Sequence, residues 1–159
     1  MKAATISEIK KELKFRSEEE TTNLVLRLAR FKKENKELLT YLLFESDQEE
    51  NYIQSIKDEA DIAFAEINRS NYYFIKKSVR KILRNLKKYS RYSNRPDTEV
   101  ELLIYFCDKL KELNPSIFRN RTLTNLYERQ LSLIERRTAK LHEDLQFEYN
   151  AKIEELTRH

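Results

Sequence analysis

The chain has 159 residues, of which 40% are apolar and 36% are charged, and it carries a formal net charge of +4. It contains no glycine, two prolines and one cysteine. Phosphate-binding loops, dinucleotide fingerprints and nucleophile elbows need glycine for positive φ angles and close backbone approach, so the composition excludes these motifs. Sheet folds also use glycine in tight hairpin turns. We therefore expect one all-α domain over residues 1–159.

The lone cysteine, Cys107, excludes an internal disulfide and a cysteine-based zinc site. It falls within an apolar helical pattern, which predicts a small buried side chain. Without glycine, asparagine is the residue best able to end a helix in the left-handed region. Asn68, Asn94 and Asn114 lie where such helix ends are predicted.

Three short helices are predicted in the first third of the chain, over residues 5–14, from residue 17, and over residues 34–44. The first two begin with capping boxes, in which Thr or Ser stands three residues before Glu. Apolar side chains at helical spacing are predicted to face inward from these helices. They are Ile6, Ile9, Leu13, Leu24, Val25, Leu28, Phe31, Leu38, Leu39, Leu42 and Leu43.

Three longer helices are predicted in the middle of the chain. Ser46 and Glu49 form a third capping box that opens a helix over residues 46–67. The next helix runs from Ser70 to about Tyr89 and is followed by the clearest loop, residues 90–96. Asp97 then caps a helix that ends before Pro115.

The C-terminal stretch, residues 122–157, contains no helix breaker, and its apolar residues recur every three or four positions. One helix of this length would span about 54 Å at about 1.5 Å per residue. That exceeds the diameter of such a domain, so the helix either projects as a dimer surface or breaks near residue 138. Six to eight helices with short connections and no strict internal repeat predict an irregular bundle or a short α-solenoid-like, HEAT-like stack.

Charge is segregated in the middle of the chain. No acidic residue lies between Glu66 and Asp97, whereas ten basic residues do. On a helical wheel, most of these cations gather opposite the apolar face, and Tyr92 follows in the predicted loop. The candidate residues for binding an anion or a nucleic acid are Lys76, Lys77, Arg80, Arg84, Lys87, Lys88, Arg91, Tyr92 and Arg95.

The acidic segment over residues 45–66 offers another explanation of this basic stripe. It holds eight acids and one base. Two helices joined by a short turn pack antiparallel, so these acids either pair with the stripe along the flanks of the hairpin or leave it solvated. An acidic protein or a membrane surface is a further alternative to nucleic acid.

Residues for catalysis or metal binding are sparse. His142 and His159 are the two histidines, and neither has a Glu-x-x-His or His-x-x-x-His partner. No nucleophile signature accompanies His142. We therefore expect no enzymatic activity, no cofactor and no small-molecule ligand.

A family resemblance covers about the first third of the chain. The segments Lys10-Lys11-Glu12-Leu13 and Glu34-Asn35-Lys36-Glu37-Leu38-Leu39-Thr40-Tyr41-Leu42-Leu43-Phe44-Glu45 resemble the opening of short all-helical bacterial proteins grouped as a domain of unknown function. The resemblance implies a bacterial, cytoplasmic, helical protein. It implies no activity and no site.

Two functional hypotheses follow from the sequence. The first is a non-enzymatic interaction or scaffold module with an unknown protein partner, or a homo-oligomer formed through the C-terminal helix. The alternative is a nucleic-acid-associated protein that binds the phosphate backbone through the basic face of the helix at residues 70–91. No apolar run reaches the length of a signal peptide or a membrane span, so we expect a cytoplasmic protein.

Overall fold

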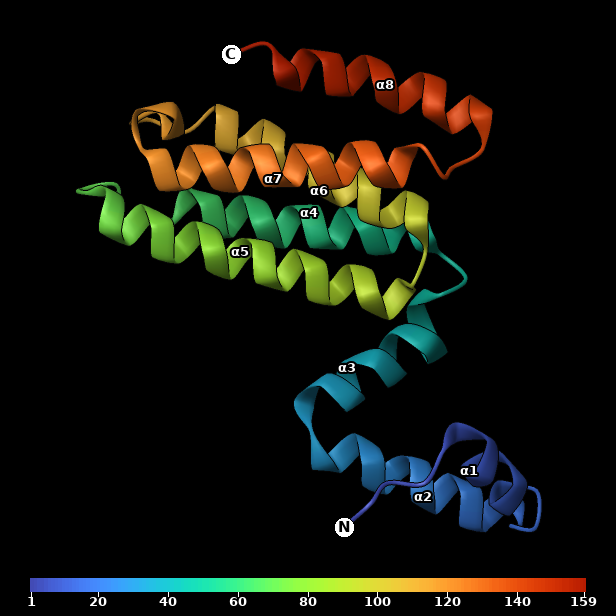
Figure 1. Ribbon diagram of the computed structural model, residues 1–159. Coiled ribbons are helices and arrows are strands. Elements are labelled where there is room, and N and C mark those ends of the chain that lie inside the picture. The colour runs from blue at the N-terminus through green and yellow to red at the C-terminus, as the bar shows by residue number, and fades with distance from the viewer. The chain divides into compact units, whose positions relative to one another are not determined.

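The computed structural model describes all 159 residues and contains only helices (Figure 1). A π-helical turn follows α3 over Tyr41–Glu45, and a 3-10 helix precedes α7 over Ile117–Arg119. The eight α-helices confirm the predicted all-α class and helix number. No helix is long and apolar enough to cross a membrane. The helices are α1 (Ile6–Leu13), α2 (Glu18–Phe31), α3 (Lys33–Thr40), α4 (Glu49–Ala65), α5 (Tyr72–Ser93), α6 (Pro96–Lys111), α7 (Arg121–Thr138) and α8 (Glu143–Thr157).

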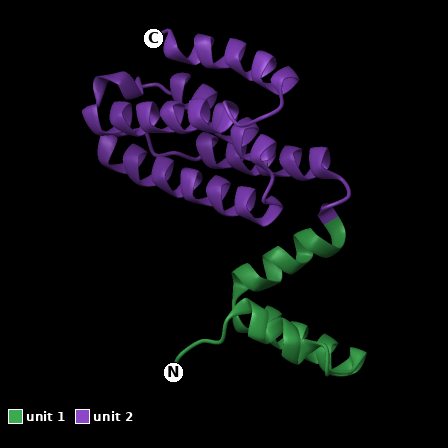
Figure 2. Cartoon of the chain, turned by 45° about the vertical axis from the view of Figure 1, so that its right-hand side comes forward, with its two compact units in different colours: residues 1–44 green, residues 45–159 purple.

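The chain divides into two compact units, unit 1 over residues 1–44 and unit 2 over residues 45–159 (Figure 2). Unit 1 contains α1 to α3, and unit 2 contains α4 to α8. The sequence predicts one domain, and whether the two units fold as one cooperative domain stays a prediction.

Unit 2 is a compact bundle with α6 at its centre. This helix packs against α4, α5, α7 and α8, and successive helices run in opposite directions (Figure 1). Val100, Phe106, Cys107 and Leu110 of α6 are fully buried, as their surrounded position requires. The core of unit 2 is therefore built around this helix.

The pattern of burial repeats along unit 2, although the residues at equivalent positions differ. Each buried residue of α7 lies 48 positions after a buried residue of α5, as Leu123 follows Ile75 and Thr138 follows Ser90. The helices α4, α6 and α8 begin 47 positions apart, at residues 49, 96 and 143. The bundle thus consists of two helix pairs, α4 with α5 and α6 with α7, followed by α8 as half of a third pair. It is a bundle whose helices are stacked as in a short solenoid.

Capping decides where several helices begin. The predicted boxes of α1 and α2 are present: Thr5 and Ser17 each accept from the backbone three residues on. The third predicted box is wrong, because Gln48 is the N-cap of α4 and makes no side-chain cap bond. The carboxylate of Glu49 accepts instead from the hydroxyls of Ser93 and Thr98.

The predicted loop over residues 90–96 is also wrong for its first half, because α5 continues to Ser93. Asn94 ends the helix with φ 54° and ψ 30° in the left-handed region, as predicted. Asn68 and Asn114 were predicted to do the same, but Asn94 is the one residue with positive φ. The last turn of α5 stays helical because Ser90 is buried and Ser93 bonds to Glu49.

The C-terminal stretch contains a break at the end of α7, at Thr138, and α8 begins at Glu143. Gln146 closes the turn by donating its amide to the carbonyl of Leu141 at 2.7 Å. The helix α8 then packs against α6 and α7, burying Tyr149 and Ile153. The buried part of its apolar stripe therefore lies inside unit 2, and Phe147 is the one large apolar side chain of α8 that is exposed. The dimer surface predicted along the C-terminal helix stays a prediction.

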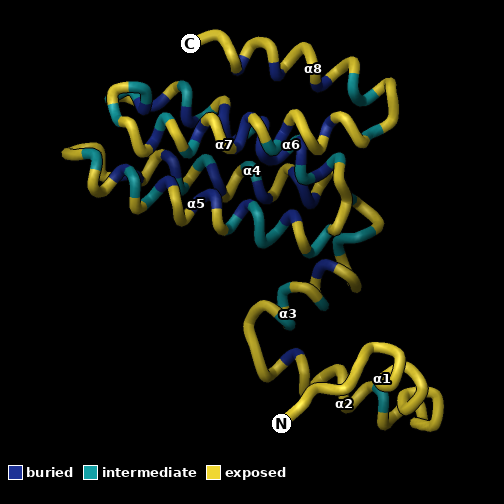
Figure 3. Tube along the Cα trace, viewed as in Figure 1, coloured by how far each residue is buried: buried dark blue, intermediate teal, exposed yellow.

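Unit 1 differs from the sequence prediction in its burial. Ala29 and Tyr41 are its buried residues, and Figure 3 shows unit 1 almost entirely exposed. The predicted inward positions are solvent-exposed because the three short helices do not enclose a common core; Leu39 alone among them is half-buried. The exposed ones are Ile6, Ile9, Leu13, Leu24, Val25, Leu28, Phe31, Leu38, Leu42 and Leu43.

A polar link between α4 and α6 leads to a pH-dependent prediction. Asp61 accepts from the Tyr105 hydroxyl and pairs with Lys109 Nζ at 3.1 Å. The Tyr105 hydrogen bond, with a smaller contribution from Lys109, lowers the pKa of Asp61. The carboxylate therefore stabilises the fold above its unfolded-state pKa, about 3.9, and this contribution is lost as the pH falls through the lower native pKa.

Asp61→Asn is expected to lower the free energy of unfolding by about 1 kcal/mol at pH 7, a value that allows for the partial exposure of the carboxylate. The difference in free energy of unfolding between Asp61→Asn and the native chain should vanish in acid. Urea unfolding at a series of pH values measures this difference. Asp47→Asn, at an exposed residue, is the control. An equal loss of stability at every pH would contradict the role of the ionised carboxylate.

Candidate nucleic-acid interface

The basic stripe predicted on the fifth helix lies on α5, and its local fold explains its position. The buried side of the helix consists of apolar residues at helical spacing, from Ile75 and Val79 to Leu86. The opposite side carries Lys77, Arg80, Arg84, Lys87 and Arg91 at intervals of three and four residues, which keeps them on one face. Of these, Lys87 is half-buried and the others are exposed.

Most cations of this stripe have no acid of α4 as a partner. Asp61 pairs with Lys109 of α6 at 3.1 Å, and the one base of α4, Lys57, pairs with Glu101 of α6 at 2.8 Å. Seven cations of α5 have no carboxylate oxygen within 4.0 Å, so self-pairing across the α4–α5 hairpin does not account for them. They are Lys76, Lys77, Arg80, Lys81, Arg84, Lys87 and Arg91.

The stripe leads into a surface groove between α5 and α7. The groove consists of two adjoining hollows, of about 690 and 500 Å³, which share Lys87 and Leu133 in their walls. Two acids, Glu99 and Glu128, line it. Its seven basic side chains define what we call the basic groove: Lys87, Arg91, Arg95, Arg129, Arg136, Arg137 and Lys140.

Two of the groove cations are neutralised within the protein. Arg137 Nε lies 3.1 Å from Glu99, and Arg95 Nη2 lies 3.2 Å from Asp97. Lys87 occupies the junction of the two hollows, where burial lowers its pKa and the charge of Glu99 opposes the shift. A partly desolvated ammonium gains more from an incoming anion than a fully hydrated one does. The groove is thus suited to anions at its centre.

The wall of the groove also contains a buried polar residue, Gln130. Gln130 lines the larger hollow and is 6% exposed, and its Oε1 has no hydrogen-bond partner. Its Nε2 donates to the carbonyl of Leu126 at 3.3 Å. The Gln130 side chain is thus tied to its own helix, and its amide oxygen keeps unused acceptor capacity.

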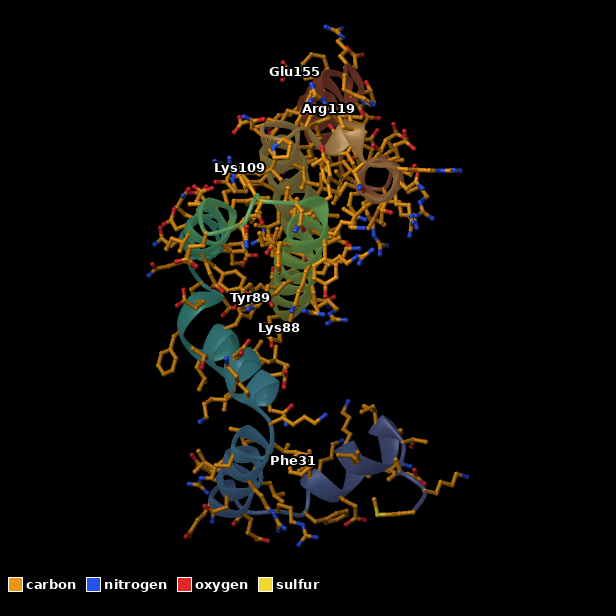
Figure 4. All side chains as sticks on the ribbon, turned by 90° about the vertical axis from the view of Figure 1, so that its left-hand side faces the viewer. Phe31, Lys88, Tyr89, Lys109, Arg119 and Glu155 are labelled. Carbon is orange, nitrogen blue, oxygen red and sulfur yellow. The ribbon has the colours of Figure 1, made fainter.

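The predicted candidates fall into three groups in the structure. Lys87, Arg91 and Arg95 line the basic groove, and Lys76, Lys77, Arg80 and Arg84 extend from it along α5. Lys88 lies over the ring of Tyr89 at 5.0 Å, and both residues are labelled in Figure 4.

Tyr92 and Lys88 do not line the groove. Tyr92 belongs to α5 and not to a loop. The centroid of its ring lies 6.1 Å from that of Tyr89. The prediction that Tyr92 lies in a loop between Arg91 and Arg95 is therefore wrong.

Sequence reasoning missed four cations of the groove, Arg129, Arg136 and Arg137 on α7 and Lys140 just after it. Their signal in the sequence is weak because Glu128 and Glu135 stand among them, so the segment has no one-sided charge. A comparison of α5 with α7 at the 48-residue offset would have indicated that the two helices occupy equivalent places in adjacent repeats.

The groups that the sequence considered for chemistry lie elsewhere. Burial raises the pKa of the Cys107 thiol to about 12. His142 caps α8 by accepting from the backbone of Asp144 at 3.3 Å, and the ring of His159 stacks on Phe118 at 4.2 Å. No cluster of three or more His, Cys, Asp or Glu side chains is placed to hold a metal ion.

Comparison of the chain with protein-family models, with curated proteins and with solved structures finds no match.

Proposed function

We propose that unit 2 binds the phosphate backbone of a nucleic acid, without catalysing a reaction on it. The observation that supports this most strongly is a run of cations on α5 that have no acidic partner and that continues into the basic groove. Phosphate contacts of this kind position a nucleic acid and do not read its sequence.

The spacing of the stripe suits a backbone of regularly placed phosphates. From Lys77 to Arg91 the stripe spans about 21 Å, with one cation per helical turn of about 5.4 Å. Arginine and lysine at this spacing release condensed counterions when they contact successive phosphates. Arginine also forms bidentate hydrogen bonds to phosphate oxygens. The groove then continues the cationic path onto α7.

The experiment measures binding of the full chain to labelled single-stranded and double-stranded DNA and RNA at low salt. A variant with Arg80, Arg84, Lys87 and Arg91 changed to Glu is expected to bind about 10²-fold more weakly or worse, because four phosphate contacts become repulsive. The measurement is a fluorescence anisotropy titration, and circular dichroism checks that the variant is folded.

The matched control reverses four exposed bases of unit 2 that do not line the groove, Arg119, Arg121, Lys152 and Arg158, to Glu. It makes the same change in net charge and is expected to bind within a few-fold of the native chain. An equal loss in both variants would mean that total charge alone drives binding. Equally tight binding to polyglutamate, or no binding of the native chain at low salt, would overturn the proposal.

A further inference from the structure

Unit 1 presents many of its large apolar side chains to water. The side chains of Phe15, Phe31 and Phe44 are 84%, 77% and 74% exposed, and only Ala29 and Tyr41 of the unit are buried. Small units bury a smaller share of their apolar surface than large ones, so a unit of 44 residues gains from burial against a partner. The unit contains no cysteine for a disulfide and no histidine for a structural zinc site. A second copy of the unit would cover these side chains.

The same unit also has grooves that would accept apolar side chains. One lies between α1 and α2, is about 250 Å³ and is lined by Ile9, Leu13 and Leu24 among others. The second lies between α2 and α3, is about 200 Å³ and includes Leu28 and Leu38. Unit 1 therefore has both protruding apolar side chains and apolar grooves beside α2, which is the combination that a self-complementary interface requires.

We infer that unit 1 is a homodimerisation module in which α2 pairs antiparallel with α2 of a second copy. The helix carries Ser17, Thr21, Leu24, Leu28 and Phe31 at alternating steps of four and three residues, the spacing of a coiled-coil seam. A two-fold axis across this seam places the protruding side chains of each copy against the grooves of the other.

Charge complementarity favours a second copy in this orientation. The first turn of α2 carries Glu18, Glu19 and Glu20, whereas its C-terminal half carries Arg27 and Arg30. An antiparallel pair places the acidic end of each helix beside the basic end of the other. In a symmetric dimer this contact occurs twice. A parallel pair would place like charges together.

The exposed area also agrees with the size of a stable interface. Burial of an aromatic side chain removes about 150 to 250 Å² from water. Phe15, Phe31 and Phe44 alone thus supply on the order of half of the ~800 Å² per partner that a standard interface buries. The aliphatic residues of the three helices supply the rest.

The first test is the oligomeric state of the full chain, measured by sedimentation equilibrium over a wide range of concentration. The native chain is expected to be a dimer, and Leu28→Lys with Phe31→Lys is expected to make it a monomer. Both residues are exposed in the single chain, so these changes leave unit 2 folded, as circular dichroism will check. Phe147→Lys on α8, also at an exposed phenylalanine, is the matched control and should remain dimeric.

The second test uses charge reversal to establish the orientation. A chain with Glu18 and Glu19 changed to Lys, and another with Arg27 and Arg30 changed to Glu, should each be monomeric. A chain that carries all four changes should dimerise again, because opposite charges then meet at both ends of an antiparallel pair. In a parallel pair, each single set of changes would leave like charges together, as in the native chain, so dimerisation would not change.

A native chain that is monomeric at every concentration overturns the inference. So does a dimer that survives the α2 changes but dissociates on Phe147→Lys, since it would form through α8. A single charge variant that dimerises as well as the native chain contradicts the antiparallel arrangement. These readouts are independent of nucleic-acid binding, so their failure leaves the proposed function of unit 2 unaffected.

Discussion

Raising the salt concentration from about 50 to about 200 mM is expected to weaken binding of the chain to nucleic acid by on the order of 10³-fold or more. This magnitude corresponds to six or more phosphate contacts. The α5 stripe and the basic groove provide enough cations without carboxylate partners, including Arg80, Arg84, Lys87, Arg91 and Lys140. The measurement is the dissociation constant by anisotropy at several salt concentrations.

The slope of log affinity against log salt concentration also gives the number of phosphate contacts. Changing Arg80 and Arg84 to Ala should reduce the slope of log affinity against log salt by about 0.9 per residue on duplex DNA, or about 0.7 on a single strand. Arg119 and Arg121 changed to Ala should leave the slope unchanged. An affinity that hardly responds to salt would mean that the contacts are not made to phosphates.

Phe106→Ala is expected to lower the free energy of unfolding of unit 2 by about 3 to 5 kcal/mol. Phe106 is fully buried on α6, the helix that packs against four others. Its ring centroid lies 5.9 Å from that of Phe64 on α4, so its removal leaves a cavity where α4 and α6 meet. The measurement is urea unfolding followed by circular dichroism.

The control for this prediction is Phe147→Ala, which removes the same side chain from the exposed side of α8. Its effect should stay within about 0.5 kcal/mol. If the two substitutions were equally mild, Phe106 would not be packed in a rigid core. The result therefore tests the central position of α6 directly.

Local features of the fold could be predicted because their causes are local. Thr5 with Glu8 and Ser17 with Glu20 form capping boxes through contacts three residues apart. The apolar face of α5 follows from helical periodicity, and Asn94 adopts the left-handed conformation that asparagine tolerates. Hydrogen bonds and sterics within a few residues determine these elements.

The candidate interface could be predicted only in part. The stripe on α5 could be predicted from the sequence because its cations share one helix face and no acid lies among them. The cations of α7, such as Arg129 and Arg136, join them only because the two helices stand in adjacent repeats of the bundle. Their assembly depends on packing between residues about 48 positions apart.

The sequence alone determined that this chain is helical, that its middle section carries an uninterrupted cationic face and that glycine-dependent sites are absent. Only the tertiary structure decided that Glu49 bonds to Ser93 and Thr98 rather than capping its own helix. It also decided that seven α5 cations, Arg80 and Arg84 among them, have no α4 acid as a partner, and that most apolar residues of unit 1 stay exposed. The reason is physical: helix formation depends on neighbours in sequence, whereas pairing and burial depend on which distant surfaces meet.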